Sequence, residues 1–172
     1  MTSDLQRLRE ASEDLADFID EIELEFVDNP NWEEPSDASY LTVDDKANPD
    51  IMSNVEAIAA TNKLIAWFGR DQEGFVGLWQ GPDNRPLSNC PVVRLDTEGQ
   101  YELIAATVAD YIAVSIDEDD FEDVREALIG AGFKVEESHD AIWKALENFD
   151  DPNDFRHGLY NQARKKRGLE AY

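Results

Sequence analysis

The sequence predicts an α+β protein built on a central, mostly antiparallel sheet with packed helices. Three apolar runs, separated by turns rich in Gly, Pro, Asn and Asp, occupy the middle third of the chain. A fourth run alternates between apolar and polar residues. Aromatic and β-branched runs bounded by such turns are typical of strands joined by hairpins. Because no helical segment separates consecutive runs, the pattern favours antiparallel pairing over a doubly wound α/β sheet.

The four predicted strands cover residues 64–68, 75–79, 92–95 and 101–105. The first is apolar on both faces, which predicts either a central strand covered on both sides or a strongly twisted one. Gly77 lies inside the second strand, where a glycine indicates a bulge or the close approach of another group.

The N-terminal segment predicts one amphipathic helix of about five or six turns. Ser3 is the expected N-cap, and the helix is expected to stop at residues 28–30, where Pro30 disfavours continuation. Its polar face is acidic and is expected to be solvated. The apolar residues at helical spacing are Leu5, Leu8, Leu15, Ile19, Ile22 and Phe26.

Residues 28–50 read as a loop, with a possible short strand at 40–43. Ser53, with Glu56 at the capping-box spacing, predicts the start of a helix that ends at Asn62.

Helices are predicted for most of the chain after the last strand. Thr107 is the expected N-cap of a first helix, Ser138 of a helix over 141–149, and the Asp151-Pro152 pair of the last one. Gly130 and Gly132 indicate the end of another helix, whose apolar residues at helical spacing are Phe121, Val124, Leu128 and Ile129. The last helix ends in a basic cluster, which is expected to pack on the acidic body: Arg164, Lys165, Lys166 and Arg167.

The chain has 172 residues and a net charge of −24. Its length suits one domain, and we expect residues 1–116 to form the core and residues 117–172 a helical extension packed on it. A field of this sign repels nucleic acid and anionic membranes and favours a basic partner. The alternative is that the charge serves solubility alone.

Cysteine usage and hydropathy predict a cytoplasmic protein. Cys90 is the only cysteine, so no intrachain disulfide can form. The first ten residues lack the apolar stretch of a secretion signal, and no apolar run approaches the roughly 20 residues that span a bilayer.

The residue pattern contains no catalytic constellation. His139 and His157 are the only histidines, and neither lies at motif spacing from a nucleophile. Cys90 has no nearby base, and its acidic surroundings favour a raised thiol pKa and a structural role. The acids of 117–120 lack the Gly and Glu spacing of an EF-hand. We therefore expect no enzyme, no cofactor and no metal.

The central stretch resembles the SUKH superfamily, which includes bacterial toxin-immunity proteins and yeast cell-wall-assembly regulators. The resemblance covers about residues 1–116 and rests on the segments LIAWFGRDQEGFVGLW, NCPVVRLDTEG and ELIAATVADYIAV. It implies an α+β fold and a protein-binding module, with no catalytic motif to carry over. The chain departs from the family pattern by lacking an Asn-Gly-Gly turn after the first helix and by extending about 56 residues further.

Three functions stay open at this point. The first is an immunity-type protein that neutralises a basic toxin effector, possibly a nuclease. The second is a regulatory interaction domain of the same fold without a toxin partner, and the third is an enzyme. For the first two, the candidate partner-binding residues are the acidic run Asp117, Glu118, Asp119, Asp120, Glu122 and Asp123, with the acidic face of the first helix as a second surface.

Overall fold

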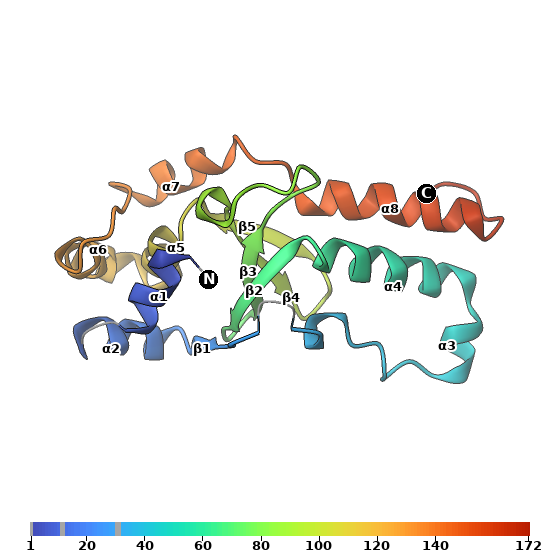
Figure 1. The fold of residues 1–172 in the computed structure, drawn as a ribbon, viewed down its shortest axis with the longest axis horizontal. Coiled ribbons are helices and arrows are strands. Elements are labelled where there is room, and N and C mark those ends of the chain that lie inside the picture. Colours follow the sequence, from blue (N-terminus) through green and yellow to red (C-terminus); the bar gives the residue numbers. More distant parts are fainter. Residues whose placement is uncertain (1, 11–12, 30–31) are drawn as a thin grey trace.

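The computed structural model describes residues 2–10, 13–29 and 32–172 and shows an α+β fold. A five-stranded antiparallel sheet has the strand order β1-β2-β3-β4-β5, with helices packed around it (Figure 1). The fold class predicted from the sequence is confirmed. The strands are β1 (Glu25–Phe26), β2 (Ile65–Arg70), β3 (Gly74–Trp79), β4 (Val92–Asp96) and β5 (Tyr101–Ala105).

Gly77 allows β2 and β3 to approach closely. It pairs with Trp67 across the hairpin, and the β2 register shifts between Trp67 and Gly69. A Cβ atom at Gly77 would meet the side chain of Ile65 and lie 2.9 Å from the Trp67 ring. The expectation of a close approach at this glycine is therefore confirmed.

The sheet buries apolar side chains on both faces, because consecutive residues of a strand point to opposite sides. One core joins the sheet to α1, α2, α5, α6 and α7 and includes Phe68, Val76, Leu78, Val92 and Ile104. The other core is largely aromatic and includes Trp67, Trp79, Val93, Leu95 and Tyr101, with Phe155 of the last helix packed against it. The prediction that the first long strand is covered on both sides is confirmed.

The helices gather at two sides of the sheet (Figure 1). The pair α4 and α8 extends from one side, and α1, α2, α5 and α6 lie at the other. The helices are α1 (Ser3–Arg9), α2 (Glu13–Glu21), α3 (Val43–Ala47), α4 (Pro49–Asn62), α5 (Val108–Ser115), α6 (Phe121–Gly130), α7 (His139–Leu146) and α8 (Pro152–Lys166), with short 3-10 turns η1 (Glu34–Ser36), η2 (Leu87–Asn89) and η3 (Glu118–Asp120).

The prediction of one long N-terminal helix is wrong. The segment forms α1 and α2, and Phe26 lies in β1, where the pair Glu25–Phe26 extends the sheet beside Arg70 and Gly69. The N-cap is Thr2, whose hydroxyl accepts a hydrogen bond from the backbone N–H of Leu5, and not Ser3. Pro30, the predicted stop, lies outside the described residues.

Two predictions for the following loop are also wrong. No strand forms at 40–43, because Thr42 makes a capping box with Asp45 and starts α3 instead. Asn48, and not Ser53, caps α4, and Pro49 takes the first helical position. Ser53 lies buried inside the helix, where its hydroxyl donates to the carbonyl of Pro49. The predicted end of this helix at Asn62 is confirmed.

The caps predicted in the C-terminal half are confirmed. Thr107, Ser138 and Asp151 each accept a hydrogen bond from a backbone N–H in the first turn of α5, α7 and α8. Gly132 follows α6 with a φ of +85°, a left-handed conformation that favours glycine.

Residues 117–172 share the cores described above. Phe121, Leu128 and Ile142 belong to the first core, and the Trp79 ring nitrogen donates to the carbonyl of Asp150 at 3.0 Å. The Asn153 side chain accepts from the backbone N–H of Tyr101 and donates to its carbonyl, so it occupies the free edge of β5. The division of the chain at residue 116 stays a prediction. Within the described ranges, no helix is both long and apolar enough to cross a bilayer.

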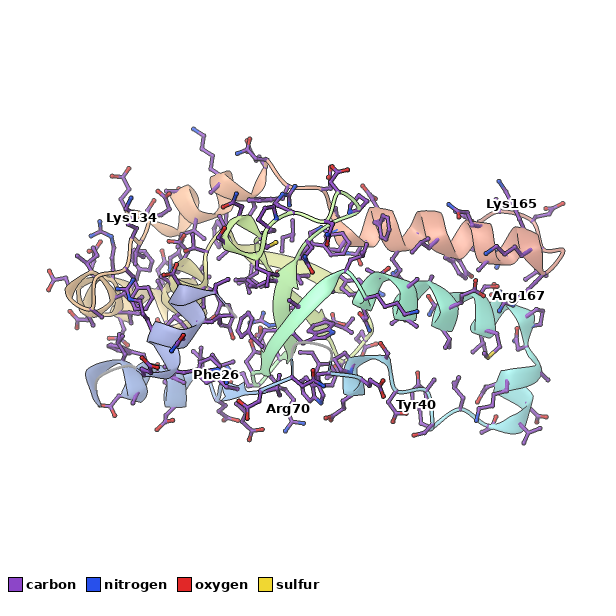
Figure 2. The ribbon with its side chains drawn as sticks, in the orientation of Figure 1. Phe26, Tyr40, Arg70, Lys134, Lys165 and Arg167 are labelled. Carbon is purple, nitrogen blue, oxygen red and sulfur yellow. The ribbon has the colours of Figure 1, made fainter. Side chains whose placement is uncertain are left out.

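The basic end of α8 packs on α4, as predicted. Arg164 pairs with Asp50, and Arg167 lies 2.8 Å from Glu56. The hydrogen bond from Arg167 lowers the pKa of Glu56. Lys166 is 3.6 Å from the same carboxylate. Figure 2 shows Lys165 on the outer side of α8 and Arg167 near α4, so most of this cluster is used within the chain.

We predict that Gly77→Ala destabilises the protein by about 1–3 kcal/mol, because the added methyl group overpacks the β2–β3 contact. Gly158→Ala is the matched control, since a Cβ there meets nothing within 4 Å on a helix. This control should stabilise α8 by about 0.5–1 kcal/mol. Urea unfolding of both variants measures the difference, and equal effects would contradict the close packing at Gly77.

Candidate functional site

The predicted acidic run lies on the surface at the start of α6. All six of its carboxylate residues are exposed, while Phe121 between them is buried in the core. Asp117 caps the short η3 turn by accepting from the backbone N–H of Asp119. Glu122 lies 3.7 Å from Arg125. Among the described residues, none of the other five is within ion-pair distance of a basic side chain, so their charge is uncompensated.

The second predicted surface lies at the same end of the molecule. Helix α2 packs against α6, and both lie at the side of the sheet opposite α4 and α8 (Figure 1). Asp17, Asp20 and Glu21 on α2 are exposed. The structure thus places two acidic surfaces that are distant in sequence at one end of the fold. We call this region, defined by those three residues and the acidic run, the acidic end.

A buried charge network lies on the α5 face of the sheet. Oδ1 of Asp71 accepts hydrogen bonds from the backbone N–H groups of Glu73 and Gly74, both at 2.9 Å, and so closes the β2–β3 turn. Its Oδ2 accepts from Nε and Nη2 of Arg94, at 3.1 and 2.8 Å, and from the hydroxyl of Tyr111 at 2.8 Å. One carboxylate therefore joins the turn, β4 and α5.

The electrostatics of this network keep both donors protonated. Burial lowers the pKa of Arg94, but the hydrogen bonds and the charge of Asp71 outweigh this effect and hold the pKa above its usual value. Burial, together with the charge of Asp71, raises the pKa of the Tyr111 phenol. Arg94 also pairs with Glu73 and, at 3.8 Å, with Glu102. Its positive charge is shared among three carboxylates.

This network was not predicted from the sequence. The signal that could have found it is the period of two in β4, which places Arg94 on the same covered face as Val92. A charged residue there needs an acidic partner, because an unpaired buried charge is costly. The partners of Arg94 could not be predicted from the sequence, because Asp71 lies on a turn and Tyr111 on a helix, both distant from Arg94 in sequence.

The single cysteine lies in the core, which agrees with the structural role expected for it. Cys90 is 3% exposed, and burial raises the pKa of its thiol. The two histidines lie on separate helices. His139 packs edge-on between Phe121 and Trp143, with ring centroids at 4.6 and 5.8 Å, and His157 is exposed on α8. In the part of the chain that the structure describes, no three His, Cys, Asp or Glu side chains are grouped to hold a metal ion.

Comparison with known proteins gives no relative. No protein-family model matches the chain, and no curated protein or solved structure is significantly similar to it. The resemblance to the SUKH superfamily therefore stays a prediction.

We predict that Arg94→Met lowers the free energy of unfolding by about 3–5 kcal/mol, because it leaves the Asp71 carboxylate buried without its cation. Arg70→Met removes an exposed arginine from β2 and should cost less than about 1 kcal/mol. Asp71→Asn should cost less in the Arg94→Met background than in the wild type, since Asn still accepts from the turn N–H groups. Urea unfolding in a double-mutant cycle tests this. Additive effects would contradict the network.

Proposed function

We propose that this protein is a non-enzymatic binding module whose acidic end binds a basic protein. The observation that carries the proposal is that ion pairs are unevenly distributed over the protein. Arg94 pairs with Asp71, and Arg164 and Arg167 at the end of α8 pair with carboxylates of α4. Among the described residues, five of the six carboxylates of the acidic run have no cationic partner. Exposed charges of one sign on one side of a protein attract a partner of the opposite sign.

We further propose that the partner is a toxin effector, of the nuclease class, which the module neutralises. The support is the resemblance of residues 1–116 to the SUKH superfamily, together with charge. A protein that cleaves nucleic acid needs a basic surface to hold phosphates. An acidic protein gains association rate with such a surface and competes with the phosphates for it.

Neutralising the acidic run should weaken capture of the partner. We predict that Asp119→Asn, Asp120→Asn and Asp123→Asn together lower the association rate constant by about tenfold at low salt, because steering depends on the local field. The matched control carries Asp44→Asn, Asp83→Asn and Glu98→Gln, which change the net charge equally at exposed sites elsewhere. The measurement is a pull-down from the host with identification by mass spectrometry, followed by binding kinetics at two salt concentrations.

Three outcomes decide between the alternatives. A basic partner whose catalytic activity falls in proportion to added module supports the immunity role. A basic partner without toxic activity supports a regulatory interaction domain. Capture that survives high salt and is equal for both triple variants would contradict binding through the acidic end.

A further inference from the structure

A cavity of about 240 Å³ opens beside the buried network and next to the acidic end. Its volume exceeds that of apolar cavities of about 150 Å³ that bind benzene in proteins. Its walls come from the β2–β3 turn, β4, β5 and the ends of α2 and α5, and Trp143 of α7 contributes to it. Ser115 lines the cavity and lies two residues before Asp117, the first residue of the acidic run.

The charge of the cavity favours a cation. Among the described residues that line it, Arg94 is the only basic one, and its Nε and Nη2 are occupied by Asp71. Glu73 and Glu102 both approach Nη1 of this arginine, but their side chains are 59% and 69% exposed at the mouth. Three carboxylates against one guanidinium leave two negative charges. An anion would be repelled, and a second cation would neutralise one of these charges.

The remaining walls suit a long, planar side chain. Trp143 is 55% exposed, which is unusual for so large an apolar ring, and Leu103 and Val114 add apolar surface. An exposed tryptophan beside carboxylates can stack on a guanidinium and bury its methylene stem.

We propose that this cavity receives an arginine side chain of the protein partner. The proposal rests on the proposed function, because it names the contact through which the basic partner is anchored. The guanidinium pairs with Glu73 and Glu102 and stacks on Trp143, and its forked donors fit acceptors on different walls better than a lysine does. Arginine and tryptophan are the residues most often found to dominate binding energy at interfaces.

The direct test uses N-acetyl-L-arginine methylamide, whose only charge is the guanidinium. We expect a saturable shift of the Trp143 indole N–H resonance in ¹⁵N NMR spectra, which Trp143→Phe assigns among the four tryptophans. The citrulline analogue has nearly the same shape without charge and should give no shift, and the lysine analogue should bind more weakly.

Two matched double variants locate the site. Glu73→Gln with Glu102→Gln should weaken binding of the arginine compound by at least about tenfold, through loss of the ion pairs. Asp83→Asn with Glu98→Gln changes the net charge equally at exposed sites outside the cavity and the acidic end, and should leave the dissociation constant within about twofold. The thermal unfolding midpoint of each variant checks that the fold is retained.

The outcomes separate this inference from the proposed function. No Trp143 shift at about 100 mM arginine compound, an equal shift with citrulline, or equal weakening by both double variants would overturn the cavity as an arginine site. Salt-dependent capture of a basic partner would still support the proposed function in that case. If the cavity binds arginine and the captured partner dissociates about tenfold faster from Trp143→Ala, the inference holds for the complex.

Discussion

The carboxylate of Asp71 is the constraint on which this structure depends. It closes the β2–β3 turn through two backbone N–H groups, pairs with Arg94 of β4 and accepts from Tyr111 of α5. A buried carboxylate requires all of these donors, because each unmet hydrogen bond is costly away from water. The turn, the β3–β4 register and the position of α5 on the sheet are therefore fixed together. Glu73 and Glu102 are held at the cavity mouth as a consequence.

Two groups of acidic residues in the described part of the chain have different physical roles. Asp71, Asp50 and Glu56 pair with arginines and join elements that are distant in sequence. The acids of the run at 117–123 lie on the surface, where water solvates them at little cost to the fold. Their mutual repulsion lowers stability slightly and is relieved when a cation approaches. Acidic residues thus both join elements inside the fold and create a negative field at its surface.

Much of the sheet was predictable from local sequence, because the strands alternate clear apolar runs with turn residues. The caps at Thr107, Ser138 and Asp151 were also predictable, since a capping side chain acts within its own first turn. The break between α1 and α2 was not, because both helices share one apolar spacing. The acidic run was predicted as a surface. Its position beside α2 was not predictable, and neither was the Asp71–Arg94 pair, because both depend on contacts between segments that are distant in sequence.

Hydrogen–deuterium exchange of the complex with its captured partner tests the central claim most directly. Binding is expected to slow exchange at the β2–β3 turn, along β5 and from the end of α5 through the start of α6. Exchange along α4 and α8 should not change, because their charges are paired with each other. Protection confined to the α4–α8 pair, with none at the acidic end, would contradict the account.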